Sequence, residues 1–107
     1  MQNKYFIVLN TCPDSASAES IATTLVRNRL AACINIIPNI RSIYEWKGEL
    51  NKGTEYLLII KTLAECYKEL EKTIQSLHPY ELPEIIAVSI EAGLPDYLTW
   101  ISEIRNE

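Results

Sequence analysis

Residues 33–62, CINIIPNIRSIYEWKGELNKGTEYLLIIKT, decide the fold of this chain. Two apolar runs, 33–46 and 55–62, flank a short segment that contains Gly48 and Gly53, and glycines between apolar runs mark turns. Pro38 has no N–H to donate to a neighbouring strand, so the first run predicts an edge strand or a strand with a bulge. The second run is continuously apolar, which is typical of a central strand covered by other elements. The stretch therefore predicts a long β-hairpin.

The residues before the hairpin predict a strand followed by a helix. Residues 4–11, KYFIVLNT, form an apolar run that suits a strand with partners on both edges. Asp14 follows Cys-Pro at a position where its carboxylate can cap a helix and interact favourably with the helix dipole. Apolar residues then recur at helical spacing from Ala18 to Leu30.

The residues after the hairpin predict a helix, a strand and a short final helix. Thr62 and Glu65 have the spacing of a capping box, and apolar residues that share one helical face follow them. Pro79 disfavours the helical conformation at the preceding residue, His78, so the helix is expected to end there. Residues 84–91, EIIAVSIE, predict the fourth strand, and Pro95 suits the start of a helix.

The predicted order of elements is β-α-β-β-α-β with a short C-terminal helix, the pattern of an α+β ferredoxin-like sandwich. No linker or low-complexity tract divides the sequence, so residues 1–107 are expected to form a single domain. Right-handed crossovers place residues 10–14, 46–53 and 78–81 at the same end of that domain. Five glutamates add carboxylates near this end: Glu45, Glu49, Glu55, Glu81 and Glu84.

Composition excludes several classes of function. The formal net charge of −4 argues against nucleic acid and anionic membrane as partners, because both require a basic surface. The apolar runs are too short to span a bilayer, and the N-terminal residues resemble a strand rather than a secretory signal. Cys12, Cys33 and Cys66 are odd in number and widely spaced. They are expected to be free thiols in a reducing cytoplasm.

His78 and Cys12 are the two candidate ligands or catalysts. His78, the only histidine, can end a helix, or it can serve as a ligand or proton carrier because imidazole titrates near neutrality. Cys12 precedes a helix N-terminus, which can lower a thiol pKa, although Asp14 opposes this effect, and a small packing residue is the alternative. Cys12 is expected to react fastest with a thiol reagent, because Cys33 and Cys66 fall in core patterns.

Ser42, Tyr44 and Trp46 alternate onto one face of the first hairpin strand. Large aromatic side chains on a strand that extends past a small domain need covering, either by the C-terminal helix or by another subunit. The residues alone therefore indicate a soluble ferredoxin-like domain that oligomerises.

Five motifs together resemble the CutA divalent-cation-tolerance family: TCPD, RLAACINIIPNIRSIYEWKGEL, LLIIKT, HPYELPEI and YLTWI. They occur in order from about Val8 to Ile101. The resemblance implies a ferredoxin-like homotrimer similar to the PII proteins, with a role in tolerance to divalent metals, copper in particular. It implies a binding or signalling module rather than an enzyme. An enzyme that uses Cys12 or His78 in a cleft between subunits and a purely structural scaffold are the alternatives.

The resemblance also implies site residues. Ser42, Tyr44 and Trp46 would lie in the trimer interface or in a cleft between subunits. Four residues of the shared junction would border this cleft, together with Glu81: Cys12, Asp14, His78 and Tyr80. A small ligand or a metal ion is the expected occupant.

The copper ligands of the family are matched only in part. Members with assigned ligands have a cysteine at the position of Asn10 and two histidines at the positions of Leu77 and His78. Thiolate and imidazole suit Cu(I), so the candidate metal ligands in this chain are His78 and, displaced by two residues, Cys12.

Overall fold

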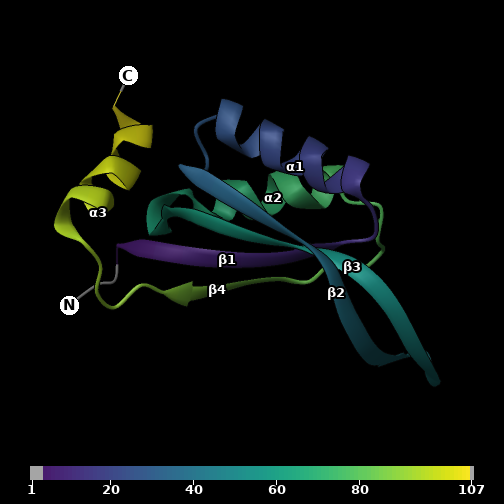
Figure 1. Ribbon diagram of the computed structural model, residues 1–107. Helices are drawn as coiled ribbons and strands as arrows, with labels where there is room; N and C mark the ends of the chain where they lie inside the picture. Colours follow the sequence, from purple (N-terminus) through teal and green to yellow (C-terminus); the bar gives the residue numbers. More distant parts are fainter. Residues whose placement is uncertain (1–3, 107) are drawn as a thin grey trace.

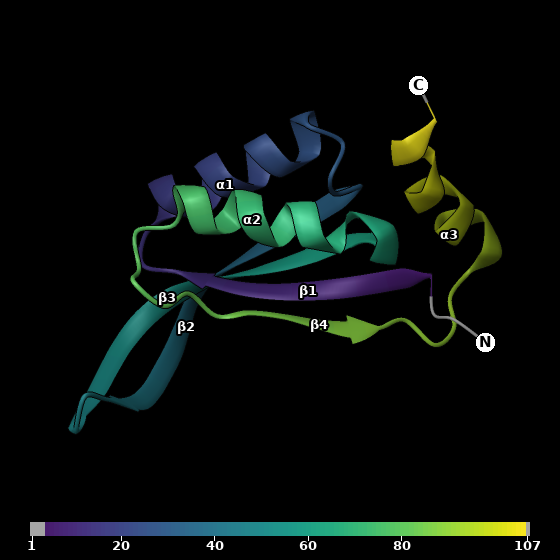
Figure 2. The ribbon, with the colours of Figure 1, turned by 180° about the vertical axis from the view of Figure 1, so that it is seen from behind.

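The computed structural model describes residues 4–106, which form one antiparallel sheet with helices on one face. The strand order is β2-β3-β1-β4, with β1 at Tyr5–Cys12, β2 at Cys33–Trp46, β3 at Glu49–Leu63 and β4 at Ile85–Ser89. Figures 1 and 2 show α1 (Ser15–Arg27) and α2 (Tyr67–Leu77) side by side over this sheet. The predicted ferredoxin-like fold is confirmed.

The edges of the sheet follow the sequence pattern. β1 is paired on both sides, with β3 and with β4, whereas β2 is an edge strand. The register between β2 and β3 shifts between Ile37 and Ile40, and Asn39 between them has φ of 62°. This bulge coincides with Pro38, as expected for a residue that cannot donate to the ladder.

The core lies between the sheet and the two helices. β1 and β3 contribute Val8, Leu58 and Ile60, each fully buried, and they face apolar residues of α1 and α2. The helices supply Ile21, Leu25, Leu70 and Ile74. The helical spacing of these four residues is what positions α1 and α2 on the sheet.

The capping box predicted at Thr62 and Glu65 is wrong. β3 continues to Leu63, a short 3₁₀ turn follows at Ala64–Cys66, and α2 begins only at Tyr67. Thr62 is buried, and its hydroxyl donates to the carbonyl oxygen of Leu30 at 2.6 Å. As a strand residue on the helix side of the sheet, Thr62 joins β3 to the segment after α1 instead of capping a helix.

The second face of the sheet carries no helix (Figures 1 and 2). Paired residues on neighbouring strands project to the same face, and the pairs Leu9↔Ile59 and Leu9↔Ile86 alternate with the buried helix-side residues. Ile86 and Val88 are 51% and 50% exposed. We call this surface the open sheet face; its apolar residues are Ile7, Leu9, Ile37, Leu57, Ile59, Ile86 and Val88.

The C-terminal helix does not cover the hairpin. α3 (Pro95–Ser102) lies at the opposite end of the sheet from the β2–β3 turn (Figure 1). It is held there by Ile101, which is fully buried, and by Arg29, which donates to the carbonyl oxygens of Ile104 and Asn106 at 2.8 Å each. The prediction that the C-terminal helix could cover the aromatic face of β2 is therefore wrong.

Candidate functional site

The β2–β3 hairpin extends beyond the rest of the sheet (Figure 1). β1 pairs with β3 only between Tyr56 and Leu63, so the remainder of β3 has β2 as its sole partner strand within residues 4–106. We call residues 40–55 the hairpin arm. The bulge before Ile40 shifts the alternation of β2 by one residue, and this places Ser42, Tyr44 and Trp46 on the same side as the open sheet face.

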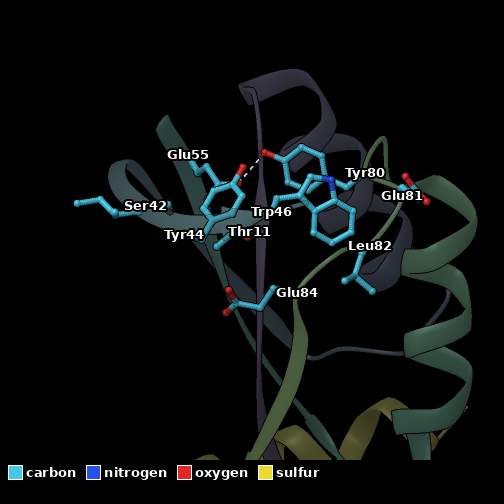
Figure 3. Close-up of a pocket in the computed structure, with 10 residues that line it drawn as sticks. Thr11, Ser42, Tyr44, Trp46, Glu55, Tyr80, Glu81, Leu82 and Glu84 are labelled. Carbon is cyan, nitrogen blue, oxygen red and sulfur yellow. Dashed lines mark hydrogen bonds between the residues drawn. The ribbon is translucent and has the colours of Figure 1, made fainter. Parts of the chain in front are cut away.

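A cleft of about 510 Å³ lies at the base of the arm. Three segments line it: the end of β1, the arm, and the connection between α2 and β4 (Figure 3). Its residues are Thr11, Ser42, Ile43, Tyr44, Trp46, Glu55, Tyr80, Glu81, Leu82 and Glu84. The three junctions that the topology places at one end of the domain therefore meet at one concave site.

Tyr80 and Glu55 are directly bonded in this cleft. The Tyr80 hydroxyl donates to Glu55 Oε2 at 2.6 Å, and Glu55 is only 7% exposed. Burial raises the pKa of Tyr80, and the hydrogen bond to Glu55 and the negative charge of that carboxylate raise it further. The phenol therefore stays protonated and remains a donor to the carboxylate.

His78 joins the α2–β4 connection to β1. Its Nδ1 accepts the backbone N–H of Tyr80 at 3.1 Å, so Nε2 carries the proton and donates to the carbonyl oxygen of Thr11 at 2.8 Å. Both nitrogens of the buried ring are thus engaged within the chain. A metal ion could bind His78 only if one of these two hydrogen bonds were broken.

Cys12 lies beneath the cleft rather than in it. The side chain is fully buried, and Sγ donates to Asn10 Oδ1 at 3.4 Å. Burial raises the pKa of this thiol to about 11, and the charges of Asp14 and Glu55 add to the rise while a hydrogen bond with Ser17 opposes it. Cys12 is therefore less accessible than Cys33, which is only half-buried, whereas the sequence pattern had placed Cys12 as the accessible thiol.

Asp14 is exposed and lies outside the set of cleft-lining residues, in contrast to its predicted place there. Its carboxylate caps α1 as expected, because Oδ1 accepts the backbone N–H of Ser17 at 2.8 Å. Hydrogen bonds from Ser17 lower the pKa of Asp14. The short side chain is hydrogen-bonded to the start of α1 and does not line the cleft.

The remaining predicted site residues line the cleft: Ser42, Tyr44, Trp46, Tyr80 and Glu81. Sequence reasoning missed Thr11, Ile43 and Leu82, and it did not anticipate that Glu55 is buried. The sequence signal for this burial was the position of Glu55 at the start of an apolar strand run. Because charged residues are seldom buried without a partner, that position also indicated a bonded partner for the carboxylate.

The residues present do not fit a metal site at His78 and Cys12. Within residues 4–106, no three His, Cys, Asp or Glu side chains are grouped closely enough to hold an ion. Asn10, at the position matched to the family's cysteine, donates through Nδ2 to the carbonyl oxygen of Glu84 at 2.9 Å. This amide joins β1 to the segment before β4 and supplies no thiolate.

The fold and the site define a class of protein: ferredoxin-like α+β domains with a protruding hairpin arm and a cleft at its base. The chain belongs to the CutA1 divalent ion tolerance protein family, whose model matches residues 6–104. Within residues 4–106, no helix is long and apolar enough to cross a membrane.

Relatives of known name support this assignment. A "Protein CutA homolog" of Xenopus laevis is 50% identical over 97 residues, which are 91% of this chain and 64% of that protein. The "Divalent-cation tolerance protein CutA" of Thermus thermophilus is 44% identical over 91% of this chain and 94% of its own length. The crystal structure of CutA from Xylella fastidiosa has a TM-score of 0.91 at 44% identity, covering 94% of this chain and 96% of that one. The chain spans just over half of the mouse and human relatives, at 54% of each.

Proposed function

We propose that this protein is a homotrimeric, PII-like binding or signalling module that serves tolerance to divalent metal ions, copper among them. Membership in the CutA1 family supports the connection with divalent cations. The trimer, the binding role and the absence of catalysis are our proposals.

The open sheet face is the main observation that supports the proposed assembly. A two-layer sandwich buries one face of its sheet, and here the other face is apolar and uncovered in the single chain. The hairpin arm continues this surface on the same side with Tyr44 and Trp46, which are 47% and 38% exposed. Further copies of this chain are the simplest cover, because a closed ring of copies hides the same face of every subunit.

The state of Cys12 and His78 supports a binding module rather than an enzyme. A buried thiol with a raised pKa is a poor nucleophile, and an imidazole with both nitrogens bonded to main-chain groups has no free nitrogen to offer a ligand. Cys12, Cys33 and Cys66 are free thiols. This state suits a reducing compartment, and we propose the cytoplasm.

A matched pair of tryptophan variants tests the assembly. Trp46 lies on the arm, and Trp100 lies on α3; both are partly exposed in the single chain. We expect Trp46→Ala to dissociate at higher concentration than the wild type, because truncating a central interface aromatic commonly costs about 2 kcal/mol or more. Trp100→Ala is expected to sediment as the wild type does. Equal sedimentation of Trp46→Ala and the wild type would contradict the placement of the arm in the interface.

A further inference from the structure

The cleft has the chemistry of a receptor for cations. Three aromatic rings line it, those of Tyr44, Trp46 and Tyr80, together with the carboxylates of Glu55, Glu81 and Glu84. Within the described residues, no lysine, arginine or histidine contributes to its lining. The face of an aromatic ring carries partial negative charge. Rings and carboxylates therefore favour positively charged ligands and disfavour anions.

The carboxylate of Glu55 has no positively charged partner among residues 4–106. Oε2 accepts the hydroxyl proton of Tyr80, whereas Oε1 makes no hydrogen bond among residues 4–106 and keeps its contact with solvent in the cleft, although the residue as a whole is only 7% exposed. A nearly buried carboxylate is costly unless its charge is paired. Figure 3 shows Glu55 among the residues that line the cleft, with the dashed line marking its hydrogen bond to Tyr80. A cation in the cleft would supply the missing partner.

The chain already places one of its own ammonium groups at the rim. Lys47 Nζ lies 5.6 Å from the centroid of the Trp46 ring and 3.7 Å from Glu81 Oε1. This is the combination of ring face and carboxylate by which alkylammonium ions are bound in aromatic sites. The Lys47 side chain is itself an alkylammonium group. It would compete with a bound cation for the Trp46 ring.

An organic cation fits this cleft better than a metal ion does. Aromatic rings are not ligands for divalent metals, which require several oxygen, nitrogen or sulfur donors around one point. Within the described part of the chain, no group of three His, Cys, Asp or Glu side chains is placed to hold a metal ion. The volume of about 510 Å³ is in the range of small-molecule sites.

We propose that the cleft at the base of the arm binds a small organic cation of the alkylammonium or quaternary ammonium class. The rings of Tyr44, Trp46 and Tyr80 provide cation–π contacts, and Glu55 Oε1 provides the counter-charge. The inference rests on the proposed function as a binding module, and it names the class of ligand.

Isothermal titration of the whole chain tests the ligand class with probes matched in shape. Tetramethylammonium and tert-butylammonium carry the charge, whereas tert-butanol has nearly the shape of tert-butylammonium without it. The variants are Glu55→Gln, which keeps an acceptor for Tyr80, and Lys47→Met, which removes the competing ammonium. Glu19→Gln removes one charge from the exposed surface of α1 and is the matched control.

We expect saturable binding of both cations and none of tert-butanol. Glu55→Gln should weaken binding roughly tenfold or more, and Lys47→Met should strengthen it several-fold, while Glu19→Gln leaves it unchanged. Equal binding of tert-butanol and tert-butylammonium would overturn the inference, as would equal affinities in Glu55→Gln and the wild type.

Sedimentation of the same samples separates the two proposals. Trimeric wild-type protein that binds neither cation overturns the ligand class and leaves the proposed assembly intact. Monomeric protein overturns the proposed assembly, and its titration still decides the ligand class by the criteria above. Far-UV circular dichroism of each variant ensures that only folded protein is compared.

Discussion

The hydroxyl of Tyr80 lies 2.6 Å from Oε2 of Glu55 and thereby joins the α2–β4 connection to the base of the hairpin arm. The partners are 25 residues apart in sequence, and Glu55 is almost completely buried. His78, two residues before Tyr80, fastens the same connection to β1 through Thr11. These two bonds hold three separate segments around one cleft.

Tyr80→Phe should destabilise the fold. The variant keeps the ring but leaves a buried carboxylate without its donor, which costs about 1–3 kcal/mol in the free energy of unfolding. Urea denaturation measures the loss. Tyr56→Phe is the control, because Tyr56 is also half-buried and its hydroxyl has no hydrogen-bond partner among residues 4–106. If both variants unfold at the same urea concentration, the Tyr80–Glu55 bond does not stabilise the fold.

Stability should fall at alkaline pH partly because of Cys12. The unfolded chain releases the thiol proton near pH 9.0, whereas burial holds the folded pKa at about 11. The neutral thiol therefore stabilises the folded state below pH 9, and this contribution is lost as the pH rises through 11. The loss amounts to roughly 2–3 kcal/mol.

Urea denaturation of the wild type and Cys12→Ala at several values between about pH 8 and 11 isolates this effect. The variant lacks the thiol, so its free energy of unfolding should decline less steeply over that interval. Parallel declines would mean that Cys12 ionises equally easily in the folded and unfolded chains.

Cys33 should be the first thiol to react in the native protein. Cys12 and Cys66 are fully buried, whereas Cys33 at the start of β2 is only half-buried. Brief treatment with iodoacetamide, followed by peptide mass mapping, identifies the modified residue. We expect Cys33→Ser to abolish the fast reaction. Modification of Cys12 or Cys66 ahead of Cys33 would show that the core around them opens readily.

Copper and zinc titrations should not distinguish the wild type from His78→Ala and Cys12→Ser. The imidazole of His78 has both nitrogens bonded within the chain, and the thiol of Cys12 is buried and protonated at neutral pH. Any metal that binds should therefore do so elsewhere. A folded His78→Ala variant that loses its metal would instead show that the ring changes partners when the ion arrives.

Much of the fold could be predicted from the sequence because its decisive residues act locally. Pro38 predicts an edge strand or a strand with a bulge, and β2 has both features; the apolar run of residues 55–62 predicts a central strand. The prediction of a capping box was wrong because a Thr-x-x-Glu spacing fits a strand end as well as a helix start. At Thr62 the competing bond to Leu30 is made only after the chain has folded.

The sequence predicts only those features of the site that the order of strands and helices determines. Element order is enough to bring Tyr80 and Glu81 to the arm. It does not give the depth of a side chain, so Cys12 at the end of β1 was expected to be accessible and is buried. The open sheet face was also missed, since a continuous apolar run does not reveal whether one or both faces of a strand are covered within the chain.

Native mass spectrometry of protein purified without added metal tests the central claim most directly, because it reports subunit number and any retained ligand together. The account predicts a dominant species with the mass of three 12.2 kDa chains at micromolar concentration. A dominant species with the mass of one chain would contradict it, because the open sheet face and the hairpin arm would then be stable in water without a partner.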